Sequence, residues 1–156
     1  ENTEVCAMIT DGEEAGLRGC KSWAKNHYDE YVNSGVETVV LCVDTLTDRE
    51  YLRVYNKDMT GTVKNNQQFS QLVMDASKDA GHDDIELSSV FFGSSDAAAF
   101  SQAGITATCL AAMDPRPADY YHNRRDTADR LVPETIKTGF DVIISTILNF
   151  DEKGLN

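Results

Sequence analysis

Apolar residues recur along the chain with two spacings, which predict strands that alternate with helices. Short apolar runs bounded by turn residues predict strands at residues 4–10, 38–43, 51–55 and 105–111. Apolar residues three to four positions apart predict helices at residues 17–32, at 66–80 and from Pro133 through Leu148. A further short helix is predicted through Ala103, where Gly104 stops it. This alternation favours a three-layer α/β domain around a mostly parallel sheet.

Some segments carry further signals. The valine-rich run at residues 38–43 predicts a central strand buried on both faces. Ser94 or Ser95 can cap the short helix, and Gly81 suits the C-terminal end of the helix before it. Residues 113–129 contain two prolines and have no period, so they predict a long loop of the kind that is often functional.

Polar side chains follow several predicted strands. Glu13 and Glu14 come directly after the first strand, Asp44 follows the second, and His122 lies in the long loop after residues 105–111. In open α/β sheets the carboxyl ends of the strands are where sites form. Carboxylate oxygens with one imidazole nitrogen suit zinc. An exposed acidic turn and a surface histidine would leave the same residues, and that simpler interpretation stays open at this point.

Composition limits the range of functions. The 156 residues, 41% hydrophobic, suit one domain. With 26 acidic and 14 basic residues the net charge is -12, which argues against a nucleic-acid partner because phosphate binding needs a basic face. The charge serves solubility or attracts cations. No apolar stretch approaches the roughly 20 residues that cross a bilayer, so we expect a soluble chain.

Four cysteines occur singly, without a pair spaced for zinc or redox chemistry. Their apolar surroundings predict free, buried thiols. A bridge between Cys6 and Cys42 is the alternative, since their strands could be neighbours. His27 and His82 stand in polar surroundings and are predicted to lie on the surface.

The chain resembles the zinc exopeptidases with two co-catalytic metals, the superfamily that includes bacterial secreted aminopeptidases, glutaminyl cyclases, glutamate carboxypeptidase and the transferrin receptor ectodomain. The matching segments are Asp11–Gly19, Val43–Asp44, Gly93–Phe100 with Gly104–Ile105, and Tyr120–His122 with Arg125–Thr127. The resemblance implies a three-layer zinc-exopeptidase (phosphorylase/hydrolase-like) fold with a central mixed, mostly parallel sheet, truncated at its N-terminal side.

The resemblance also implies a role for each matching residue. Glu13 would be the general base, which takes a proton from zinc-activated water and passes it to the leaving amine. Glu14 and His122 would hold one zinc ion, and Asp44 the other. Tyr121 is similar to a phenol that some members direct at the developing oxyanion. A core tyrosine beside a loop is the competing interpretation.

Two further acids could support the site. Asp126 could accept a hydrogen bond from the His122 imidazole, or could instead cap a turn or pair with a neighbouring arginine. Asp96 could belong to the pocket, or could be a helix-start carboxylate favoured by the helix dipole. The family often has histidine after this aspartate, where Ala97 stands here. Cys20 replaces the usual serine and should affect packing only.

In this family a His-x-Asp ligand motif and the aspartate that bridges both metals come before the Glu-Glu segment, whereas this sequence begins at Glu1. We therefore expect residues 1–156 to be the C-terminal portion of a single catalytic domain. The complete site would hold two zinc ions, while these residues alone should bind zinc weakly or not at all and should not turn over peptides. We also expect an exposed sheet edge, covered by self-association or by the N-terminal part.

The sequence thus predicts a metallo-exopeptidase, an aminopeptidase acting on peptide substrates. The alternatives are a glutaminyl cyclase-like enzyme with a single zinc and a metal-free, receptor-like interaction domain. The presence of Glu13, Glu14, Asp44 and His122 weighs against the receptor-like alternative. Because most relatives are secreted or face outside the cytoplasm, an extracellular or outward-facing membrane-associated location is expected.

Overall fold

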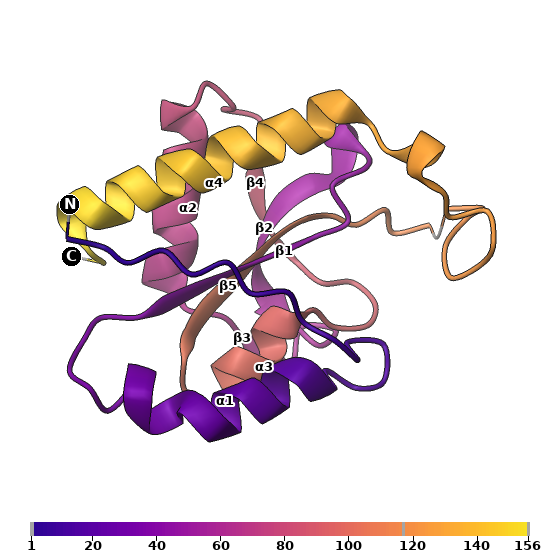
Figure 1. Ribbon diagram of the computed structural model, residues 1–156. Coiled ribbons are helices and arrows are strands. Elements are labelled where there is room, and N and C mark those ends of the chain that lie inside the picture. Colours follow the sequence, from indigo (N-terminus) through magenta and orange to yellow (C-terminus); the bar gives the residue numbers. More distant parts are fainter. Residues whose placement is uncertain (1, 117, 156) are drawn as a thin grey trace.

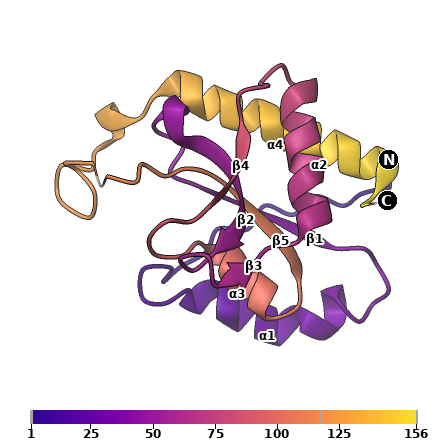
Figure 2. The same ribbon diagram turned by 180° about the vertical axis from the view of Figure 1, so that it is seen from behind.

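Helices cover both faces of a twisted sheet in the computed structural model, which describes residues 2–116 and 118–155 (Figure 1). The helices α1 and α3 lie on one face, and α2 and α4 on the other (Figures 1 and 2). In chain order the elements are α1 (Arg18–Tyr31), β1 (Val39–Asp44), the 3-10 helix η1 (Arg49–Tyr51), β2 (Leu52–Asp58), β3 (Val63–Lys64), α2 (Gln67–Asp79), β4 (Glu86–Ser89), α3 (Asp96–Gln102), β5 (Thr106–Ala112), the 3-10 helix η2 (Ala128–Arg130) and α4 (Pro133–Lys153).

The sheet is mixed. Its strand order is β1-β5-β2-β3, with β4 also paired to β2. The pairs β1–β5 and β2–β4 are parallel, whereas β2 runs antiparallel to both β5 and β3. The predicted three-layer α/β architecture with a mixed sheet is therefore confirmed, and β2 supplies the antiparallel component.

β5 contributes to both apolar cores because successive side chains of a strand point to opposite faces. Cys109 packs in the core under α1 and α3, and Leu110 packs in the core under α2 and α4. Phe100 of α3 and Phe69 of α2 are the largest fully buried side chains of the two cores. Burial of one such side chain contributes about 1.5–3 kcal/mol.

Several boundaries match the sequence expectations within a residue or two. α2 begins after Asn66, whose side-chain oxygen accepts a hydrogen bond from the Phe69 N–H at 2.9 Å. Gly81 follows α2 with φ of 84°, a left-handed conformation that glycine adopts without strain. The short strands β3 and β4 were not expected, because two and four residues are too few to show a period.

Two strand expectations are wrong. Residues 4–10 form no strand, and Val5 and Ile9 are 59% and 99% exposed. The run at residues 38–43 is not a central strand, since β1 pairs with β5 on one side only within the described residues and none of its side chains is fully buried. Apolar content alone does not show whether a neighbouring strand is available to pair.

α4 turns much of its apolar surface outward. Phe140, Ile144 and Leu148 are 59%, 54% and 64% exposed, and the buried side includes Gly139. A Cβ at Gly139 would lie 2.5 Å from a Leu46 methyl carbon, so glycine allows the close approach. We call the three exposed residues the α4 stripe.

No helix in the described ranges is both long and apolar enough to cross a membrane.

The described cysteines are free thiols, so the Cys6 to Cys42 bridge is not formed. Cys20 and Cys109 are buried as expected. Cys6 is exposed, so its expected place in the core is wrong because the segment that carries it does not join the sheet.

Candidate active site

The acidic loop, residues 11–14, caps the first helix with its backbone. Arg18 donates its N–H to the Gly12 carbonyl at 3.0 Å. Gly19 donates its N–H to the Asp11 carbonyl at 2.9 Å. These bonds satisfy amides that have no partner inside the helix, and no side chain caps this end. The carbonyls of the loop therefore face α1, which fixes the loop in place.

Gly19 is required for this arrangement. A Cβ at this position would lie 2.3 Å from the Asp11 oxygen and 2.9 Å from the Asp11 nitrogen. Both atoms belong to the backbone, so no side-chain rotation relieves the contact. The glycine of the Asp11–Gly19 segment thus serves close packing between the loop and the helix.

The structure brings Glu14 and His122 together. Glu14 Oε1 lies 2.7 Å from His122 Nε2, and both side chains are more than half exposed. His122 has φ of 56°, and its ring stacks on Tyr121 with the ring centroids 3.8 Å apart. Tyr121 is itself 52% exposed, so it is not a core tyrosine.

Glu13 is half-buried within an acidic environment. The pKa of its carboxyl is raised from 4.5 to about 7, chiefly by burial and then by the neighbouring carboxylates Glu14, Asp44 and Asp96, while His122 acts in the opposite direction. The acids predicted from distant segments therefore influence one another electrostatically. Such an accumulation of negative charge favours a bound cation, whose own charge would dominate the local field.

Asp44 ends β1, next to the end of β5 in the parallel register that pairs it with Ala111. Its exposed side chain accepts a hydrogen bond from the Thr45 hydroxyl at 3.1 Å. The long loop follows β5 and therefore begins at the same carboxyl end of the two strands. The carboxyl ends of two parallel strands thus bring Asp44 and the loop that carries His122 to one side of the molecule.

Asp96 opens α3, directly after the cap residue Ser95, whose hydroxyl accepts a hydrogen bond from the Ala97 N–H at 3.2 Å. The expected helix-start position of Asp96 is thus observed. Its carboxylate also accepts a hydrogen bond from the Thr10 hydroxyl at 2.7 Å. Thr10 was missed from the sequence, because a single threonine before the acidic loop carries no signal.

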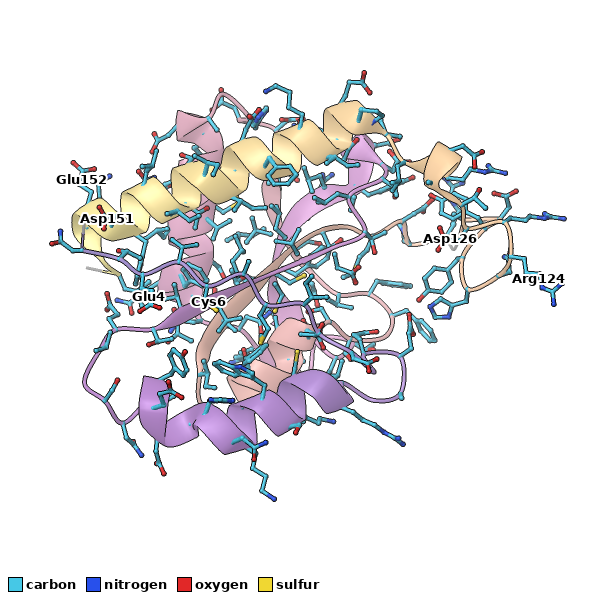
Figure 3. All side chains as sticks on the ribbon, viewed as in Figure 1. Glu4, Cys6, Arg124, Asp126, Asp151 and Glu152 are labelled. Atoms are coloured by element: carbon cyan, nitrogen blue, oxygen red, sulfur yellow. The ribbon has the colours of Figure 1, made fainter. Side chains whose placement is uncertain are left out.

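Within residues 2–116 and 118–155 no hydrogen bond or ion pair joins Asp126 to the imidazole of His122. The Asp126 backbone N–H donates to the Asn123 carbonyl at 3.1 Å, within a turn of the long loop. Figure 3 shows Asp126 on this loop and Arg124 extending from it into solvent. In the described residues the ion-pair partner of His122 is Glu14, so the expected bond from Asp126 to the imidazole is absent. Of this loop, Pro117 lies outside the described residues.

A second residue that the sequence did not reveal is Asp58, which is fully buried at the end of β2. Its carboxylate accepts hydrogen bonds from the Ser95 N–H at 2.9 Å, the Ser95 hydroxyl at 2.5 Å and the Met59 N–H at 2.7 Å. Asp58 therefore fixes the start of α3, and with it the position of Asp96.

The donors fit only part of a zinc site. A catalytic zinc ion usually has three protein ligands, and the Glu14–His122 pair supplies one oxygen and one nitrogen. Across residues 2–116 and 118–155 no group of three or more His, Cys, Asp or Glu side chains is placed to hold a metal ion. The chemistry of the pair suits zinc, whereas the number of donors is incomplete.

The fold and the family profile together define the class of the protein as an α/β domain of a peptidase family. The chain belongs to Peptidase family M28, whose sequence profile matches residues 2–147. The expected fold and family are thereby confirmed. The comparison with curated proteins found no match.

Three solved structures share the fold. The LapA aminopeptidase of Legionella pneumophila has 17% identity and a TM-score of 0.70, covering 88% of this chain and 37% of that chain. An aminopeptidase from Aneurinibacillus sp. strain AM-1 has 23% identity and a TM-score of 0.68, with 86% and 30% covered. A glutaminyl cyclase from an Acidobacteriales bacterium has 17% identity and a TM-score of 0.69, with 88% and 47% covered. The chain thus spans less than half the length of each.

Proposed function

We propose that residues 1–156 are the C-terminal portion of the catalytic domain of a zinc-dependent aminopeptidase, which removes N-terminal residues from peptides. The 2.7 Å contact between Glu14 and His122 carries the proposal, because it joins a carboxylate and an imidazole from opposite ends of the chain. Membership of a peptidase family and the aminopeptidases among the similar structures support it.

In this proposal Glu14 and His122 would hold one zinc ion and Asp44 the other, with the remaining donors supplied from outside residues 1–156. Bound zinc supplies a Lewis acid that lowers the pKa of water to about 7. The half-exposed positions of Glu14 and His122 leave room for such additional donors. By itself this chain is proposed to bind zinc weakly or not at all and to be inactive.

Glu13 is proposed as the general base. It accepts the proton of the attacking water at its carboxylate and passes it to the leaving amine. A base must be ionised to accept a proton, and the carboxyl of the metal-free chain has a pKa of about 7. A nearby cation favours the charged carboxylate, so metal binding would lower this pKa and prepare the base.

Tyr121 is proposed to donate a hydrogen bond from its phenol to the oxyanion that forms on the peptide carbonyl. Its ring stacks on the His122 imidazole at 3.8 Å between centroids, which holds the phenol beside the proposed ligand pair. Burial first, and then the carboxylates Glu14, Glu13 and Asp44, raise the pKa of Tyr121. The phenol therefore stays protonated, as a hydrogen-bond donor must.

The open edge of β1 and the α4 stripe are proposed to be covered by the N-terminal part of the complete domain or by self-association. β1 leaves one edge without a strand partner in the described ranges, and the stripe residues are 54–64% exposed. Unpaired strand edges and apolar patches of this kind are usually covered in stable proteins. By its resemblance to the family the complete protein is proposed to act outside the cytoplasm.

The complete protein tests the proposal directly. Aminoacyl anilides should be hydrolysed, whereas peptides with N-terminal glutamine should not be cyclised. Glu13→Ala should abolish turnover while zinc content is retained, and Glu14→Ala should lower zinc content. Hydrolysis by the Glu13→Ala variant would show that the base is assigned wrongly. Cyclisation without hydrolysis would favour the glutaminyl cyclase alternative.

A further inference from the structure

Thr10 connects two parts of the chain that are far apart in sequence. Its hydroxyl donates a hydrogen bond to Asp96 Oδ2 at 2.7 Å, in a partly buried position. Across the described residues this is the one hydrogen bond that joins the segment before α1 to α3. Thr10 also directly precedes Asp11, whose carbonyl accepts the N–H of Gly19. The acidic loop is therefore held by α1 through its backbone and by α3 through Thr10.

Asp96 is a suitable anchor because its own position is fixed. It begins α3 immediately after Ser95, and the fully buried Asp58 holds Ser95 through its backbone N–H and its hydroxyl. The Thr10 hydroxyl thus binds a carboxylate that cannot easily follow the loop if the loop moves.

The loss of this bond would be costly. Asp96 Oδ1 is buried and has no hydrogen-bond partner, so Thr10 provides an important donor to this carboxylate. A hydrogen bond to a charged group is stronger than one between neutral groups, and a buried carboxylate that loses its donor keeps its desolvation penalty. Opening of the loop would break this bond, and without the hydroxyl the closed loop would cover a carboxylate that lacks this donor.

We propose that Thr10 is a positioning residue, which locks the acidic loop to the start of α3 and thereby sets the positions of Glu13 and Glu14. This inference rests on the proposed peptidase site, but it concerns how firmly the acidic loop is held in the chain itself. If Thr10 does not hold the loop, the proposed roles of Glu13 as base and Glu14 as ligand are unaffected. If the complete protein is inactive, the hydrogen bond from Thr10 to Asp96 can still hold the loop.

Amide hydrogen exchange of the 156-residue chain tests the lock. The reporters are the N–H groups of residues 16–19, which donate to the carbonyls of residues 11–13. Thr10→Val keeps the shape of the side chain and removes the hydroxyl, so exchange at residues 16–19 should become about ten-fold faster or more. Thr10→Ser restores the hydroxyl and should return exchange to within about two-fold of the original rate.

Thr38→Val is the matched control. The Thr38 hydroxyl donates to the Tyr31 carbonyl at 3.0 Å, at the opposite end of α1, so this variant loses a threonine side-chain hydrogen bond without touching the loop. It should leave the amides of residues 16–19 unchanged. The proposal is overturned if Thr10→Val leaves these amides protected, if it accelerates α4 equally, or if Thr10→Ser behaves like Thr10→Val.

Discussion

Substitution of Gly19 by alanine sets two physical effects against each other. Gly19 lies in the first turn of α1, where alanine is favoured over glycine by about 1 kcal/mol from helix propensity alone. In this structure the added Cβ would meet the Asp11 oxygen at 2.3 Å, whereas real Cβ contacts essentially never fall below 3.0 Å. The backbone of the acidic loop must therefore move by at least about 0.7 Å, the difference between these two distances.

The steric effect should win. Overpacking of this kind costs about 1–3 kcal/mol, and the Gly19–Asp11 hydrogen bond that would be strained contributes about another 1 kcal/mol. After the gain from helix propensity is subtracted, Gly19→Ala should lower the free energy of unfolding by about 1–3 kcal/mol.

Urea unfolding followed by circular dichroism measures this difference as a shift in the midpoint at constant slope. Ser22→Ala is the control, because Ser22 is exposed on the same helix and its change should stay within about 0.5 kcal/mol. A Gly19→Ala variant as stable as the original chain, or more stable, would refute the close packing of the loop against α1.

Four further results are expected. Because the pKa of Glu13 is raised from 4.5 to about 7 in the folded chain, its ionisation opposes folding, increasingly so between these values and fully above pH 7. Glu13→Gln should therefore leave the free energy of unfolding unchanged at pH 4 and raise it by about 1 kcal/mol at pH 8, after allowance for solvent screening. Urea unfolding at both pH values measures this difference, and an equal change in the free energy of unfolding at pH 4 and pH 8 would contradict it. Calorimetric titration of the metal-free chain with zinc should give weak binding or none, and two tight sites per chain would show that its donors suffice. Asp58→Ala should lower the free energy of unfolding by about 3 kcal/mol, because it leaves the buried N–H and hydroxyl of Ser95 without their acceptor. Asp83 is exposed, so Asp83→Ala should change the free energy of unfolding little, and similar thermal melts of the two variants would refute the role of Asp58. If the α4 stripe drives self-association, Ile144→Glu should shift the sedimentation profile toward the monomer. Glu152 is exposed on the same helix but lies outside the stripe, so Glu152→Gln should leave the sedimentation profile unchanged.

Much of the fold is determined locally, and those parts were predictable. Residues 66–80 have apolar positions at helical spacing, a capping asparagine and a terminal glycine, and α2 forms within a residue or two of the expected bounds. The apolar run at 105–111 becomes β5 because its residues can be buried on both faces of the sheet. The strand expected at residues 4–10 failed, because strand pairing depends on a neighbour that no local pattern describes.

The sequence by itself determined which side chains can carry the chemistry: the adjacent Glu13 and Glu14, the strand-end Asp44 and the loop His122. Only the tertiary structure decided which of them meet. It brought Glu14 to His122 at 2.7 Å, left Asp126 in its own turn and joined Thr10 to Asp96. The physical reason is that residue type and periodicity are local properties, whereas these contacts depend on how loops leave the sheet and how helices approach one another. Side-chain hydrogen bonds between distant segments depend on the geometry that the packed apolar cores impose.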